Sequence, residues 1–222
     1  MSFDGFFLHH MVQELKAELL SGRIQKINQP FEQELVLQIR GNRKNQKLLL
    51  SAHSVFGRIQ RTQTNFENPA FPNTFIMVMR KYLQGAVIEG IEQMENDRIL
   101  EIRVSNKNEI GDAISVSLMI EIMGKHSNII FCDDKGMILD SIKHVSSHMS
   151  SVRVVLPGRE YFIPKTQDKL DPLTVSEELF REVVCRKPCN ISKAIYSSLT
   201  GISPVVAEEV CFRASVDGSE AA

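Results

Sequence analysis

Asp97 and Arg98, a pair between two predicted strands, have side chains suited to binding a phosphate or a base. The planar guanidinium of an arginine matches a phosphate or the edge of a guanine. The aspartate can accept a hydrogen bond from an amino group, or it can orient the arginine. The same pair also suits a solvated hairpin tip that binds nothing, and both interpretations stay open on the residues alone.

A second candidate, the segment GKHSNII (124–130), directly follows a predicted strand. Gly124 permits a turn, and the next four residues are small or polar donors: Lys125, His126, Ser127 and Asn128. The segment resembles part of a phosphate-binding loop but lacks the G-x-x-x-x-G-K-[ST] spacing. It is therefore either an ordinary hairpin turn or a contact for an anion or RNA.

Cations gather in the N-terminal quarter of the chain. Residues 1–61 have a net charge of +4, whereas residues 166–222 have a net charge of −3. If a hairpin brings the basic side chains together, they form a patch that can release counterions from a nucleic-acid backbone. Otherwise they form a solvated face. The residues concerned are Arg40, Arg43, Lys44, Lys47, Arg58 and Arg61.

The segment LTGISPVVAEEV (199–210) has the pattern of a helix-hairpin-helix motif. Gly201 permits a tight turn between two helices, and Pro204 opens the second helix. Exposed amides at the start of that helix can hold a phosphate oxygen. Proline is also ordinary in the first turn of any helix, so a plain helical hairpin used for packing is the alternative.

The sequence contains no signature of catalysis. There is no G-x-S-x-G elbow, no G-x-G-x-x-G after a strand, and no histidine spacing typical of zinc. Cys185 and Cys189 stand four residues apart with Pro188 between them, which favours structural or inert thiols over a metal or redox pair. We therefore expect a non-enzymatic protein that has neither a cofactor nor a metal.

Composition and the absence of targeting segments predict the protein's cellular compartment and broad class. The 26 Lys and Arg nearly balance the 27 Asp and Glu, which excludes a strongly basic tail and an acidic disordered segment. The sequence lacks an apolar run of about 18 residues, so we expect no membrane span. The N-terminus lacks the basic region and cleavage site of a signal peptide, so we expect a cytoplasmic protein.

The elements that position these residues follow from hydrophobic periodicity. Alternating residues and frequent turns favour a mostly antiparallel sandwich or barrel, hence an α+β protein with a β-rich part (1–168), a linker near 165–172 and a helical end (169–222). The predicted strands are 34–40, 47–52, 86–94, 98–105, 113–122, 128–131 and 137–142. The predicted helices are 4–20, a short one around 75–82, and then 173–184, 191–199 and 204–214.

Several segments together resemble the NFACT-N domain of the fibronectin-binding protein A (RqcH) family, whose eukaryotic relatives are NEMF and Tae2. The resemblance covers nearly the whole chain. The segments that carry it include FDGFFLHHMVQELKAELLSGRIQKINQP (3–30), LLLSAHSVFGRIQRT (48–62), the stretch 68–102 that ends in ENDRILEI, IEIMGKHSNIIFCD (120–133), and ISKAIYSSLTGISPVVAEEV (191–210).

The resemblance implies a β-rich domain like that of formamidopyrimidine-type DNA glycosylases, followed by a helix-hairpin-helix region that is cut short. The start Met1-Ser2-Phe3 lacks the N-terminal proline nucleophile of those enzymes, so their chemistry is not expected. The implied role is ribosome-associated quality control. Its partners would be the obstructed large ribosomal subunit with its rRNA, and alanyl-tRNA, which supplies the alanine tail of a stalled chain.

The resemblance also assigns roles to residues. The family's tRNA-recognising Asp-Arg pair falls on Asp97 and Arg98, and the family's GKHSN segment falls on residues 124–128. We expect the chain to be a fragment, without the family's coiled coil and second RNA-binding domain. It should therefore bind tRNA weakly and should not support tailing alone. The alternative is a fibronectin-binding adhesion module, exposed at the bacterial surface without a signal peptide.

Overall fold

The computed structural model describes residues 3–108, 110–165 and 168–222. The chain divides into two compact units. Unit 1 consists of Met1–His10, Gln93–Arg98 and Lys165–Ala222, and unit 2 consists of Met11–Glu92 and Ile99–Pro164. The predicted division at residue 168 stays a prediction about separately folding domains. Part of the predicted linker (166–167) and the first two residues of the Met1-Ser2-Phe3 start lie outside the described residues.

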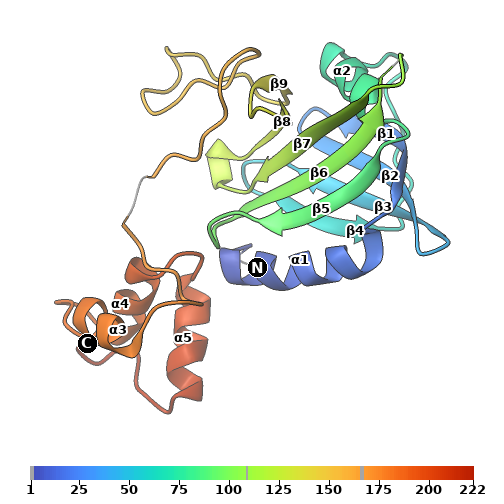
Figure 1. Ribbon diagram of the computed structural model, residues 1–222. Helices are drawn as coiled ribbons and strands as arrows, with labels where there is room; N and C mark the ends of the chain where they lie inside the picture. Colours follow the sequence, from blue (N-terminus) through green and yellow to red (C-terminus); the bar gives the residue numbers. More distant parts are fainter. Residues whose placement is uncertain (1–2, 109, 166–167) are drawn as a thin grey trace. The chain divides into compact units, whose positions relative to one another are not determined.

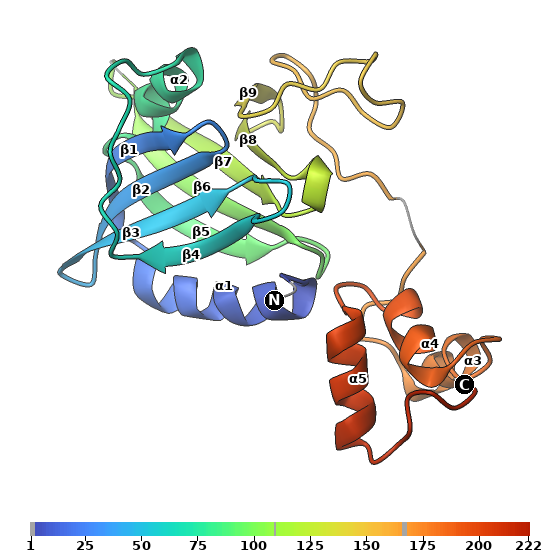
Figure 2. The ribbon, with the colours of Figure 1, turned by 180° about the vertical axis from the view of Figure 1, so that it is seen from behind.

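Unit 2 is built on a nine-stranded sheet in the order β4-β3-β2-β1-β5-β6-β7-β8-β9 (Figures 1 and 2). Strand pairs on both sides of β5 are antiparallel, as in β2–β3 and β6–β7. The predicted α+β class is therefore confirmed, with a large antiparallel sheet, whereas the sandwich or barrel form stays a prediction. The strands are β1 (Arg23–Phe31), β2 (Glu34–Gly41), β3 (Lys44–Ser51), β4 (Arg58–Thr62), β5 (Val87–Gln93), β6 (Ile99–Lys107), β7 (Ala113–Glu121), β8 (Asn128–Asp133) and β9 (Ile138–Ser141).

Helix α1 (Gly5–Leu19) begins where the sequence predicts, because Asp4 caps it. The Asp4 Oδ1 atom accepts a hydrogen bond from the backbone N–H of Phe7 at 2.8 Å, which satisfies one of the unpaired donors of the first turn. Beyond residue 10, Val12, Leu15 and Leu19 are buried on one stripe of the helix. Helix α2 (Thr74–Leu83) is capped in the same way by Asn73.

Strand β1 was not among the predicted strands, because its buried residues do not alternate. Ile24 and Ile27 are both buried at a spacing of three, and the register shifts between Ile24 and Lys26. Such a bulge absorbs one extra residue and hides the period of two. Strand β4 was also missed, since its five residues contain a single apolar side chain, Ile59.

Unit 1 contains three short helices, α3 (Glu177–Val183), α4 (Ile191–Ser198) and α5 (Pro204–Arg213). Helix α3 begins four residues later than predicted, because Ser176 is its cap and Leu173 lies in a turn formed by Asp171. The helices enclose a small core of Val184, Ala194, Ile195, Leu199, Ala207 and Cys211. Within the described residues, no helix has both the length and the apolar character needed to cross a bilayer.

Candidate nucleic-acid interface

The loop between β5 and β6 holds Asp97 and Arg98 in a fixed backbone conformation. Glu95 and Asn96 both adopt the left-handed region, with φ of 50° and 53°. The Gln93 amide Nε2 donates to the backbone oxygens of Gly5 and Asp97, both at 2.8 Å. These bonds tie the turn to Gly5 and fix its backbone, while the Gln93 Oε1 atom is buried without a partner among the described residues.

Arg98 is not locked inside the core of unit 1. Its Nε atom lies 3.6 Å from Oδ1 of Asp97, and its side chain is 42% exposed. The same Asp97 oxygen accepts the backbone N–H of Arg98 at 2.7 Å. Asp97 therefore fixes the backbone of Arg98 and orients its guanidinium loosely, which leaves guanidinium donors for a ligand.

Lys169 of the C-terminal segment lies near this loop, and Lys187 lies near Lys169. The Lys169 ammonium donates to the backbone oxygen of Tyr196 at 3.0 Å, and the Lys187 ammonium donates to Ser197 Oγ at 3.1 Å. Burial lowers the pKa of Lys169. The charge of Asp97 opposes this shift, whereas the charges of Arg98 and Lys187 add to it. Lys169 thus lies within electrostatic reach of both residues of the loop.

Gly201 joins the helical hairpin to the loop through backbone contacts. Its φ is +71°, as a tight turn requires, and its carbonyl accepts the backbone N–H of Phe6 at 3.0 Å. A Cβ atom at Gly201 would lie 2.3 Å from the backbone oxygen of Asn96, and one at Gly5 would lie 2.6 Å from the Gly201 Cα. These close approaches exclude any side chain, so the turn positions the Asp97–Arg98 loop. A phosphate contact at Gly201 stays a prediction.

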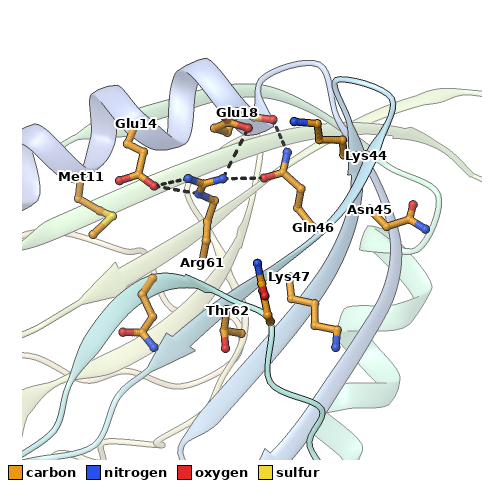
Figure 3. A pocket seen from close by; sticks show the side chains of 11 residues that line it. Met11, Glu14, Glu18, Lys44, Asn45, Gln46, Lys47, Arg61 and Thr62 are labelled. Carbon is orange, nitrogen blue, oxygen red and sulfur yellow. Dashed lines mark hydrogen bonds and ion pairs between the residues drawn. The ribbon is translucent and has the colours of Figure 1, made fainter.

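The predicted basic hairpin in unit 2 differs from the Asp97–Arg98 loop, because the protein's own carboxylates already bind one of its arginines, Arg61. The Arg61 guanidinium lies 2.7 Å from the Glu14 carboxylate and 3.6 Å from that of Glu18 (Figure 3). It also donates to Gln46 Oε1 at 3.2 Å. Arg58 pairs in turn with Glu34 at 3.2 Å. Both arginines therefore stabilise the protein's own elements.

The six cations do not form one patch. Arg40, Arg43 and Lys44 lie at the tip of the β2–β3 hairpin, whereas Arg58 pairs with Ser51 at the other end of β3. Eight residues of strand separate these positions by roughly 23 Å. A groove of about 770 Å³ adjoins the hairpin (Figure 3), lined by Met11, Glu14, Glu18, Lys44, Asn45, Gln46, Lys47, Gln60, Arg61, Thr62 and Gln63.

The GKHSN segment forms a 3-10 turn, η1 (Gly124–His126), in which Gly124 has a φ of +58°. Lys125 and His126 are exposed. Ser127 and Asn128 are buried instead. The Ser127 hydroxyl accepts the N–H of Met123, and the Asn128 amide donates to the Lys143 carbonyl. Lys125 and His126 can therefore reach an anion in solution, whereas Ser127 and Asn128 stabilise the turn.

Chemistry by metals or thiols finds little support in the described part of the chain. Among those residues, no group of three or more His, Cys, Asp or Glu is arranged to hold a metal. Burial, together with the nearby carboxylates of Asp133, Glu101 and Glu121, raises the pKa of the Cys132 thiol to about 12, which makes the thiol unreactive. Cys185 is exposed and Cys189 is partly buried.

Sequence reasoning missed the contribution of Lys169 and Lys187. Lys169 stands in the predicted linker and Lys187 stands next to Pro188, where an isolated lysine has no distinguishing pattern. Only the folding of unit 1 brings Lys169 near a loop far earlier in the chain, and Lys187 near Lys169. No signal in a single sequence identifies such a pairing.

Comparison with known proteins gives consistent matches. Residues 4–222 match the family described as NFACT N-terminal and middle domains. The Rqc2 homolog RqcH of Streptococcus pneumoniae is 59% identical over 95% of this chain, and that of Bacillus subtilis is 43% identical over 97%. The chain spans 38% of the length of each of these two relatives.

Two solved structures are similar over most of the chain. The N-terminal domain of the fibronectin-binding protein PavA from Streptococcus pneumoniae has a TM-score of 0.90 and 58% identity, covering 96% of this chain and 80% of that one. The N-terminal part of the fibronectin/fibrinogen-binding protein from Streptococcus suis has a TM-score of 0.90 and 54% identity, covering 98% and 81%.

Proposed function

The chain belongs to the family of NFACT N-terminal and middle domains, whose relatives include ribosome quality control proteins, and from this premise we propose that it is an RNA-binding module of such a factor. In this proposal it binds tRNA and the rRNA of the obstructed large ribosomal subunit, and it makes and breaks no covalent bond. Alanine tailing belongs to the full-length protein, of which this chain supplies the tRNA-recognising part.

The observation that carries the proposal is the half-exposed Arg98, whose Nε atom lies 3.6 Å from Asp97 and which lies within electrostatic reach of Lys169. A phosphate backbone that binds Arg98 and Lys169 releases its counterions, while the arginine fork adds contacts to a base edge. The internally bonded loop lowers the entropic cost of this contact.

The helical hairpin of α4 and α5 supports the same proposal. Ser203 caps α5 by accepting the N–H of Val206, and Pro204 follows in the first turn. We assign this pair of helices to a helix-hairpin-helix segment that braces the loop, within a scaffold of the glycosylase N-domain type. We also place the protein in the cytoplasm, where its RNA partners are, and cell fractionation tests this placement.

The proposal is tested by the affinity of the chain for alanine tRNA. Replacing Arg98 by alanine removes the fork, and we expect a loss of about 1–3 kcal/mol of binding free energy. Asp97→Asn should weaken binding less, because the amide still accepts the backbone N–H of Arg98. Fluorescence anisotropy at several salt concentrations measures both effects.

Arg181→Ala is the matched control for this experiment. Arg181 is an arginine of the same unit, 71% exposed, and its partner is Glu177 of the same helix. It should leave the affinity for tRNA unchanged. Equal affinities for the wild-type chain and Arg98→Ala, with the same dependence on salt, would remove the proposed role of the loop.

Fibronectin binding is the second candidate, because the two solved structures above carry that name at 54% and 58% identity. Binding of fibronectin by the pure chain, measured beside tRNA binding, separates the candidates. Tight fibronectin binding without salt-sensitive tRNA binding would reverse the order. Detection of the protein on intact cells, compared with lysate, would show whether that binding is accessible.

A further inference from the structure

A surface of unit 2 combines an exposed aromatic ring with cations that the Asp97–Arg98 loop does not use. It is formed by the loop after β3 and by the turn η1 after β7, and we call it the ring-and-cation surface (His53, Phe56, Lys125 and His126). Phe56 is 66% exposed, although a ring of this size is normally buried. Its neighbour Val55 is exposed as well.

The ring is held in place before any ligand binds. The Nδ1 atom of His53 accepts the backbone N–H groups of Val55 and Phe56, both at 3.1 Å. The imidazole and the phenyl ring stack with centroids 5.2 Å apart and planes inclined by 24°. One face of the Phe56 ring thus lies on His53, and the rest of the ring is offered to solvent.

The turn η1 lies beside the loop that carries this ring, because the two segments pack together. A Cβ atom at Gly57 would lie 3.4 Å from Ser127 Oγ and 3.3 Å from Ile122 Cγ2. A Cβ atom at Gly124 would lie 3.8 Å from the backbone oxygen of Ser54. Lys125 and His126 stand between Gly124 and Ser127 in the chain, and both are exposed.

The charges under the loop leave this surface positive. Arg58 donates to the carbonyl of Phe56 at 2.8 Å and is paired with Glu34. The Lys143 ammonium donates to the carbonyl of Ala52 at 2.6 Å, and Glu32 acts on it from a distance. Glu34 is thus paired with Arg58, and Lys125 adds an exposed positive charge.

We propose that the ring-and-cation surface binds an unpaired nucleotide of a single-stranded RNA segment. The base stacks on the outer face of Phe56, and Lys125 and His126 hold the adjacent phosphate. Stacking on an aromatic ring tolerates every base, so the contact selects single-stranded RNA without reading its sequence. The inference rests on the proposed RNA-binding function but uses residues apart from Asp97 and Arg98.

The test uses a single-stranded RNA hexamer that contains 2-aminopurine, whose fluorescence is quenched when the base stacks. Phe56→Ala should weaken hexamer binding about tenfold and abolish the quenching, since one base stack is lost. Phe56→Tyr should restore both. Phe71→Ala removes another exposed phenylalanine of unit 2 and should change neither. Lys125→Ala should lower the salt dependence of binding and leave the quenching in place.

The outcomes separate this inference from the proposed function. Hexamer binding that is unchanged in Phe56→Ala overturns the inference. Absence of hexamer binding together with tRNA binding that depends on Arg98 overturns it too, and leaves the proposed function standing. Absence of binding to both RNAs overturns both. Weaker fibronectin binding by Phe56→Ala, with RNA binding unaffected, assigns the surface to a protein partner and also overturns the inference.

Discussion

Arg98 in unit 1 and Arg61 in unit 2 are both arginines beside carboxylates, but their surroundings differ in charge. Arg61 lies between Glu14 and Glu18 and donates to Gln46 as well. Arg98 has a looser contact with the carboxylate of Asp97, and Lys169 lies within electrostatic reach of both residues. The guanidinium of Arg61 is thus held on several sides by the protein, whereas that of Arg98 has one long contact with a carboxylate among the described residues.

The difference shows why a count of basic residues does not locate a binding surface. The N-terminal quarter has the largest excess of positive charge, yet its arginines on β4 bind carboxylates of the protein. A charge that is satisfied internally contributes to stability, whereas a cluster of like charges costs stability and attracts an oppositely charged ligand. Three substitutions test this contrast.

Gly201→Ala should have the largest effect, because it disturbs the packing that positions Arg98. The new Cβ would meet the backbone oxygen of Asn96 at 2.3 Å, and alanine is strained at a φ of +71°. We expect the free energy of unfolding to fall by about 3 kcal/mol and the tRNA affinity to fall with it. Thermal unfolding and anisotropy measure the two quantities.

Gly136→Ala is the control for this substitution. Gly136 has a φ of +77°, but a Cβ there would have no heavy atom within 4 Å. Only the conformational strain remains, so the loss should be about 1 kcal/mol, with tRNA affinity unchanged. Equal losses in the two variants would show that the contact with Asn96 does not matter.

Arg61→Ala should have an intermediate effect of the opposite kind to Arg98→Ala. It removes the ion pairs to Glu14 and Glu18, which are partly exposed, and so should lower the free energy of unfolding by about 1 kcal/mol. Its affinity for tRNA should stay within about twofold of wild type, because the paired charge binds no phosphate. A large loss of affinity with unchanged stability would contradict the contrast between the two arginines.

Lys169→Gln should have the smallest effect, and its sign is informative. The pKa of Lys169 is lowered in the folded state, so its protonated form is less favourable there than in the unfolded chain. Removing the charge while keeping an amide donor for the Tyr196 carbonyl should raise the free energy of unfolding at pH 7 slightly. The gain should shrink as the pH rises from the lowered pKa towards 10.5, where the unfolded lysine also loses its proton.

Chemical denaturation of both proteins at several pH values checks this prediction. Because the charge of Lys169 contributes to the proposed tRNA contact, Lys169→Gln should also weaken tRNA binding and reduce its salt dependence by about one counterion. A variant that is less stable than wild type at pH 7, or equally sensitive to salt in tRNA binding, would argue that Lys169 belongs to the structure alone.

Periodicity predicted most of the fold. The alternation of Val116, Leu118 and Ile120 marks β7, and the predicted helix at 4–20 matches α1, which Asp4 caps. The cap of α2, Asn73, was not predicted. The prediction missed strand β1, because a bulge adds one residue and interrupts the alternation of buried and exposed side chains. Local sequence therefore predicts elements wherever their geometry is regular.

The sites depended on pairings across long stretches of chain, which local patterns do not contain. Asp97 and Arg98 were singled out by their chemistry and by a resemblance, but the approach of Gly5 and Gly201 to their loop joins three distant segments. Likewise, Glu14 neutralises Arg61 from 47 residues away. Whether a cation is neutralised depends on the residues that folding brings next to it, so it could not be predicted from counts of charges along the chain.

Unit 1 is assembled from three separate stretches of chain, and this limits how the protein can be cut. A break near residue 165 leaves Met1–His10 and Gln93–Arg98 on the other fragment, so the helices after the break lose the segments that complete their unit. The piece from 168 to 222, expressed alone, should thus lack the surface that Gly5 and Asn96 cover at Gly201. The Asp97–Arg98 loop and its supporting helices therefore complete one unit and should fold only when all three stretches are present.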